Sequence, residues 1–100
     1  MTSETKSRDA PGHHIGRVQG VEKRGKHGIA FGIATSATLD GSITFSLIPP
    51  VWNERDAEHK IALPEAGHRV VLEDLRWKED GGWRAYRARY WRPEDAKYLS

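Results

Sequence analysis

The sequence contains no cysteine, a single methionine and no long run of apolar residues. Without cysteine the chain has no disulfide, no thiolate nucleophile and no Cys-ligated zinc site, which fits a protein of a reducing compartment. The first residues lack the apolar stretch of a secretory signal, and no segment reaches the length of a transmembrane helix. We therefore expect a soluble, cytoplasmic protein that does not use a membrane.

A strong excess of one charge is also missing. Sixteen Lys and Arg face fourteen Asp and Glu, so the formal net charge is +2. This small excess excludes a dense polycation that coats DNA without specificity. One hundred residues make one domain, and a chain of this size buries roughly two thirds of its unfolded surface.

The sequence patterns that identify enzymes are absent as well. No serine stands in a Gly-x-Ser-x-Gly turn, and the five histidines show no His-Glu-x-x-His spacing. The glycines from Gly25 onward lack the Gly-Lys-Ser/Thr ending of a phosphate loop, and a strand rather than a helix is predicted after them. We expect no enzymatic activity, no catalytic residues, no metal site and no cofactor.

Apolar residues divide the chain into three parts. Residues 1–14 contain few of them and are predicted to form a disordered N-terminal tail, because burial cannot offset the entropy lost on ordering. From Ile15 onward, short apolar runs alternate with Gly, Pro and charged turns, as in all-β domains. We predict a β-barrel over residues 15–92 and a short C-terminal turn or tail over residues 93–100.

Five strands are predicted, over residues 15–21, 29–35, 42–47, 69–77 and 83–91. In the second strand Ile29, Phe31 and Ile33 alternate with small residues, so we expect Phe31 to point inward. Asp40 and Gly41 predict a hairpin turn. Alternation slips near Glu73 and Asp74, which indicates a β-bulge.

Residues 53–60 change period after two prolines. Asn53 is a candidate N-cap, acids follow it, and a base ends the segment, so one or two turns of helix are predicted. Five strands with a short helix between the third and fourth is the element order of the OB-fold, a small Greek-key barrel. The alternative is a Src-homology-3-like barrel, which also has about five short strands but does not call for that helix.

The last predicted strand combines arginines with aromatic residues. Alternation places Tyr86 and Tyr90 on one face and Arg87, Arg89 and Trp91 on the other. If the tyrosines fill the interior, the outer face is a basic row flanked by tryptophans. Such a row suits single-stranded nucleic acid, because guanidinium groups meet phosphates and rings stack on bases at about 1–3 kcal/mol each. It equally suits a plain barrel, in which rings fill the core and arginines keep an outer strand soluble.

Cations also occur in the loops that flank the ligand face of OB-folds, which join the first two and the last two strands. Together with the last strand they define a candidate nucleic-acid interface. Its predicted residues are Lys23, Arg24, Lys26, Trp77, Trp83, Arg84, Arg87, Arg89 and Trp91.

The order of residues from Ile15 to Tyr90 resembles the cold-shock domain, a family of OB-folds. Residues 16–18 (GRV) resemble its opening strand, residues 25–33 (GKHGIAFGI) its second strand, residues 40–46 (DGSITFS) its third, and residues 65–70 (EAGHRV) the turn into its fourth. The resemblance implies binding of single-stranded RNA or DNA without catalysis or cofactor. The family stacks bases on outward rings of its second and third strands. Those positions here are expected to hold Ala30 or Gly32, and Thr44 and Ser46, so we expect the binding surface on the last strand.

A second hypothesis uses the same barrel as a protein-interaction module. In it the tryptophans, with Val51 and Trp52 after the double proline, form an exposed patch for a protein partner or for a second copy in a homodimer. The direction in which the tryptophans point separates the two hypotheses.

Overall fold

The computed structural model describes residues 9–98. Five strands are followed by one 3-10 helix. They are β1 (Asp9–Arg24), β2 (Ile29–Ser36), β3 (Leu39–Ser46), β4 (Arg69–Trp77), β5 (Trp83–Tyr90) and η1 (Pro93–Tyr98).

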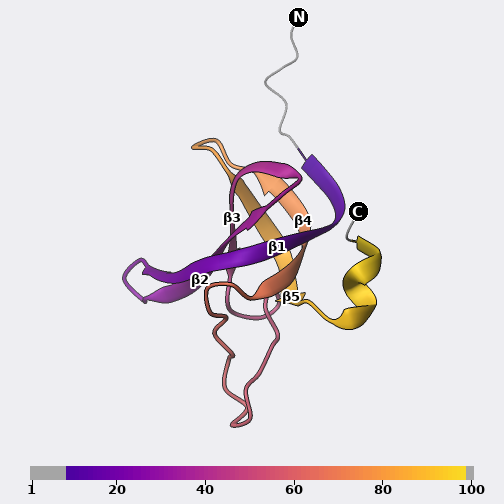
Figure 1. Ribbon diagram of the computed structural model, residues 1–100. Coiled ribbons are helices and arrows are strands. Elements are labelled where there is room, and N and C mark those ends of the chain that lie inside the picture. The colour runs from indigo at the N-terminus through magenta and orange to yellow at the C-terminus, as the bar shows by residue number, and fades with distance from the viewer. Residues whose placement is uncertain (1–8, 99–100) are drawn as a thin grey trace, which may run out of the picture.

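The strands close into a single barrel in the order β1-β2-β3-β5-β4, with β4 pairing back onto β1 (Figure 1). Neighbouring strands are antiparallel except β3 and β5, which run parallel. The predicted all-β fold, a closed five-stranded barrel, is confirmed. The β1–β2 hairpin and the long β3–β4 connection project away from it (Figure 1).

The barrel begins earlier than the sequence indicated. β1 starts at Asp9, and residues 9–14, expected in the disordered tail, pair with the end of β4: Ala10 lies opposite Leu75 and His13 opposite Glu73. Ala10 is buried in the core. Pairing with β4 satisfies the backbone hydrogen-bonding groups of this stretch, which orders it although it contains few apolar side chains. Residues 1–8 of the predicted tail lie outside the described part of the chain.

Large side chains from β3, the β3–β4 connection and β5 fill the barrel. Phe45 and Trp52 are fully buried, with ring centroids 5.6 Å apart, and Tyr90 packs edge-on against Trp52 at 5.0 Å. The indole N–H of Trp52 donates a 2.8 Å hydrogen bond to the carbonyl of Ala62, so its polar atom is satisfied inside the core.

The predicted facing of β2 is wrong. Gly32 and Ala34 are buried and face the interior, whereas Phe31 is only partly buried and Ile29 is exposed. Gly32 lies opposite Phe45, and a Cβ added to Gly32 would come within 2.4 Å of that ring. The small residues therefore face inward because the neighbouring strand already fills the space, and Phe31 is placed on the outer side.

The predicted irregularity at Glu73 and Asp74 is present. Asp74 has φ of 56°, and the buried positions change from Leu72 to Leu75 across it. The neighbouring strand changes side in the same way, since both Ala85 and Ala88 are buried. Strict alternation on β5 was therefore a wrong expectation, and Tyr86 and Tyr90 do not share a face.

Residues 53–60 do not form the predicted helix. The carboxylate of Asp56 accepts hydrogen bonds from the backbone N–H groups of Glu58 and Lys60. His59 has φ of 65°, outside the helical range, and Arg55 forms an isolated antiparallel β-bridge with Ile61. An aspartate that bonds to nearby backbone groups stabilises a turn in place of a helix. The one helix in residues 9–98 is η1, after β5.

The β2–β3 turn also differs from expectation. It is formed by Ala37 and Thr38, and Asp40 and Gly41 lie inside β3. Gly41 has φ of 85° and lies against Gly82 of the β4–β5 loop, where an added Cβ would be 3.3 Å from the Gly82 Cα. Glycine at position 41 therefore allows two backbone segments to approach closely, and it does not form a hairpin turn.

Candidate nucleic-acid interface

The predicted cations of the first loop are at the surface. Lys23 and Arg24 end β1 and Lys26 lies in the β1–β2 turn, and all three are exposed. Gly25 and Gly28, both with positive φ, form this turn, and the Gly28 N–H donates to the Gly25 carbonyl at 3.2 Å. The β1–β2 hairpin therefore presents three cationic side chains to solvent.

The tryptophans of the last two strands, Trp77 and Trp83, pack against each other. Trp83 is 2% exposed, and its indole N–H donates to the Asp40 carbonyl at 2.9 Å. Its ring packs edge-on against the half-buried Trp77, with centroids 5.2 Å apart. The predicted role of Trp83 in binding bases is therefore not supported, because its ring is buried at the barrel end.

Trp91 and Trp52 are likewise engaged. The guanidinium of Arg69 lies 5.3 Å from the Trp91 ring centroid, and the buried indole nitrogen of Trp91 has no hydrogen-bond partner among residues 9–98. Trp52, expected in an exposed patch with Val51, is fully buried. The protein-interaction hypothesis therefore loses Trp52 and Trp83 from the exposed patch on which it depended, whereas Trp77 and Trp91 are half-buried.

Arg89 is held by a carboxylate. Its two terminal nitrogens donate to the two oxygens of Asp95 at 2.6 and 2.8 Å, and the Arg92 backbone N–H donates to the same carboxylate at 2.8 Å. The hydrogen bonds from Arg89 are the main reason that the pKa of Asp95 falls to about 2, and the backbone hydrogen bond from Arg92 lowers it further. Arg89 fastens η1 to β5, so its predicted role as a phosphate ligand is not supported.

Arginines and aromatic rings do meet elsewhere, on the outer face of the barrel. Phe31 from β2 and Tyr86 from β5 lie on either side of Arg84, whose guanidinium carbon is 5.5 Å from each ring centroid. Arg24 lies 5.4 Å from the Phe31 ring, and Arg76 lies 5.6 Å from the Tyr86 ring. We call this continuous set the aromatic–arginine row; its members, in spatial order, are Arg24, Phe31, Arg84, Tyr86 and Arg76.

The row crosses the barrel from β1 and β2 to β5 and β4. Because β3 lies between β2 and β5, the contact of Phe31 with Arg84 passes over β3. Thr44 and Ser46 of β3 are buried, and in the ladders Thr44 lies opposite Arg84 and Ser46 opposite Phe31. The row therefore covers the face of β2 and β3 that lies next to the β1–β2 and β4–β5 loops.

The charges of the row differ in how firmly they are held. Arg24 pairs with Glu22 at 2.9 Å and Arg76 with Asp74 at 3.3 Å, and these pairs are exposed to solvent. Exposed pairs of this kind contribute little free energy, so other anions can replace the carboxylates. Arg84 is half-buried between the two rings, which restricts its orientation.

Two of the predicted residues, Arg24 and Arg84, thus belong to the row, and Lys23 and Lys26 lie near its β1 end. The sequence interpretation missed Phe31, Tyr86 and Arg76. The small residues of β2 opposite the large Phe45 were the available clue to the outward position of Phe31. Comparison with models of protein families, with curated proteins and with solved structures gave no match.

A pocket of about 680 Å³ lies between the start of β1 and the β2–β3 turn, away from the row. His13, at its edge, stacks on Tyr98 of η1 with centroids 4.3 Å apart and pairs with Glu73 at 3.2 Å. The stacking holds η1 against β1, and the contact with Glu73 joins β1 to β4. Within residues 9–98, no group of three or more His, Asp or Glu side chains could hold a metal ion. In the same range no helix is long and apolar enough to cross a lipid bilayer.

Proposed function

We propose that this protein binds single-stranded RNA or DNA on the aromatic–arginine row, without catalysis. The observation that carries the proposal is the row itself: two outward rings, Phe31 and Tyr86, separated by the guanidinium of Arg84 at 5.5 Å from both. Flat rings and guanidinium planes are the groups on which unpaired bases stack, and arginine charge is what a phosphate backbone meets.

The position of the row on the barrel supports the same function. OB barrels bind oligonucleotides on the face of their second and third strands, between the loops that join strands one and two and strands four and five. The row covers this face, with Lys23 and Lys26 at the first loop and Lys78 beside the second. The outward position of Phe31 on β2 also agrees with the proposed kinship to the cold-shock family, whose second strand carries stacking rings.

The row is held before a ligand arrives. Arg84 lies between two rings, so its guanidinium needs little ordering on binding. Arg24 and Arg76 can exchange their exposed carboxylate partners for phosphates, because pairs in water differ little in free energy. Binding of this kind weakens as salt is raised, since each phosphate contact releases counterions.

The test is fluorescence anisotropy of a labelled single-stranded oligonucleotide, titrated with protein at low and moderate salt. Tyr86→Leu removes an exposed ring of the row, and Phe31→Leu removes the other. At about 1–3 kcal/mol per stacked base, each substitution should weaken binding by about fivefold to about 150-fold. Tyr98→Leu is the matched control, because it makes the same change on η1, outside the row.

Equal affinities of the Tyr86 and Tyr98 variants would contradict the proposal. So would an affinity of the wild-type protein that does not change with salt. Arg84→Gln gives a separate test of the charge, and it should lower both the affinity and the salt dependence, by a slope of about 0.7 for one phosphate on a single strand.

A further inference from the structure

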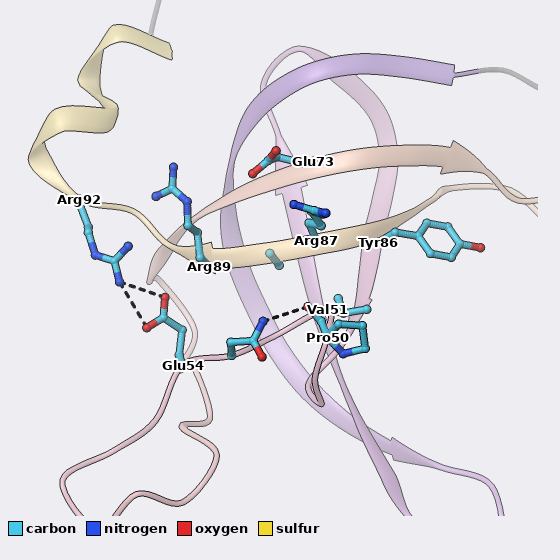
Figure 2. A pocket seen from close by; sticks show the side chains of 10 residues that line it. Pro50, Val51, Glu54, Glu73, Tyr86, Arg87, Arg89 and Arg92 are labelled. Carbon is cyan, nitrogen blue, oxygen red and sulfur yellow. Dashed lines mark hydrogen bonds and ion pairs between the residues drawn. The ribbon is translucent and has the colours of Figure 1, made fainter.

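A groove of about 510 Å³ runs along the second half of β5 (Figure 2). Pro50 and Val51 form an apolar wall on one side, and Ala88, which is small and buried, leaves room beneath. Tyr86 lies at one end of the groove, and Glu54 and Arg92 lie at the other, as Figure 2 shows.

Three arginines line the groove, and two of them already have partners. Arg89 is fastened to Asp95, and Arg92 pairs with Glu54 at 3.3 Å. Arg87 is exposed and lies between Tyr86 at one end of the groove and Arg92 at the other. Within residues 9–98, its side chain forms no ion pair at or below 4.0 Å. The groove thus offers one cationic group to an incoming anion.

Carboxylates limit how much negative charge the groove accepts. Glu54 and Glu73 both line it, and a carboxylate oxygen of Glu73 lies 3.2 Å from Nε2 of His13. A triphosphate or a second phosphate would meet these like charges and be repelled. One phosphodiester suits the groove better, because its phosphate needs one cation and the ring faces of its sugar and base can pack on the apolar wall.

Tyr86 connects the groove with the aromatic–arginine row. Its ring contacts Arg84 and Arg76 of the row, and the same residue lines the groove. A strand whose base stacks on Tyr86 therefore has Arg87 and the Pro50–Val51 wall as its next surface along β5.

We infer that the groove holds the nucleotide that follows the one on Tyr86, with its phosphate on Arg87 and its sugar and base against Pro50 and Val51. This inference rests on the proposed function and extends it, since it gives the direction in which the bound strand leaves the row. It also assigns Arg87 a role separate from that of Arg84: Arg87 contributes only when the strand is long enough to enter the groove.

The experiment compares oligodeoxythymidylates of three, five and eight nucleotides, measured by anisotropy with the wild-type protein, Arg87→Gln and Arg17→Gln. Arg17 is an exposed arginine of β1 that lies in neither the row nor the groove. Arg17→Gln therefore changes the net charge as Arg87→Gln does, but leaves the proposed site intact. Arg87→Gln should weaken binding of the longest oligonucleotide about fivefold and reduce its salt slope by about 0.7. Binding of the shortest should stay within twofold of the wild type.

Three results have distinct meanings. A loss that grows with oligonucleotide length for Arg87→Gln but not for Arg17→Gln supports the inference. If the wild-type protein binds and the two variants behave alike at every length, the groove is not part of the site, while the proposed function stands. If the wild-type protein binds none of the oligonucleotides even at low salt, the proposed function fails and the inference fails with it.

Discussion

Gly32→Ala tests the packing that places Phe31 on the outer face. A Cβ at Gly32 would lie 2.4, 2.6 and 2.9 Å from three carbon atoms of the Phe45 ring. Phe45 is fully buried in the barrel, so its ring has no open space to enter. Overpacking a core of this kind costs about 1–3 kcal/mol, and three contacts below 3.0 Å favour the upper half of that range.

The assay is urea unfolding followed by circular dichroism, with a thermal melt as a second measure. A loss of about 2 kcal/mol corresponds to a fall in Tm of about 8–16 °C for a domain of this size. Gly20→Ala is the matched control, because nothing lies within 4 Å of an added Cβ there and Gly20 does not have a positive φ. Its stability should stay within about 0.5 kcal/mol of the wild type.

Equal stability of the two alanine variants would refute the inward position of Gly32. The opposite facing of β2, with Phe31 inside, makes contrary predictions: Gly32→Ala would be harmless, and Phe31→Ala would cost about 3–5 kcal/mol, as for a fully buried ring. With Phe31 only partly buried, we expect Phe31→Ala to cost clearly less than the about 3–5 kcal/mol of a fully buried ring.

The remaining predictions concern the Arg89–Asp95 ion pair, which fastens η1 to β5, and the buried Trp83. Asp95→Asn should lower the free energy of unfolding by about 2 kcal/mol, because it weakens charged hydrogen bonds to Arg89. The folded pKa of Asp95, about 2, lies below the ordinary 3.8, so its stabilisation is complete above about pH 4 and is lost as the pH falls toward 2. Urea melts across that range should show a steeper decline for the wild type than for the variant, and parallel profiles would contradict the assignment. Trp83→Phe should lower stability but leave oligonucleotide affinity unchanged, since Trp83 is buried; lost affinity at unchanged stability would show that this ring does bind bases.

Local patterns in the sequence were sufficient for the strands and the fold class. Apolar runs separated by Gly and Pro turns predicted all five strands, and the broken alternation at Glu73 and Asp74 predicted the change of side that Asp74 makes with its positive φ. These features depend on neighbouring residues along the chain, which a sequence displays directly. The basic β1–β2 turn with its two glycines was predictable for the same reason.

The facing of β2 and β5 depended on partners far away in sequence. Alternation gave two faces for β2, but only Phe45 across the ladder decided that the small residues point inward. In the same way, the change of side at Asp74 carried over to β5 and separated Tyr86 from Tyr90. The helix expected over residues 53–60 failed because the Asp56 carboxylate bonds to its own loop.

Residue patterns along the chain were enough to predict a small five-stranded barrel whose basic and aromatic residues gather near two loops. Which of these residues a ligand can reach depends on contacts between strands that are distant in the sequence. Trp83 and Arg89 have the right chemistry for nucleic acid, but the Trp83 ring is buried in the core and the Arg89 guanidinium is bound to Asp95. Phe31 and Tyr86 come together around Arg84 because β2 and β5 flank the same strand, a juxtaposition of residues more than fifty positions apart that barrel closure alone creates.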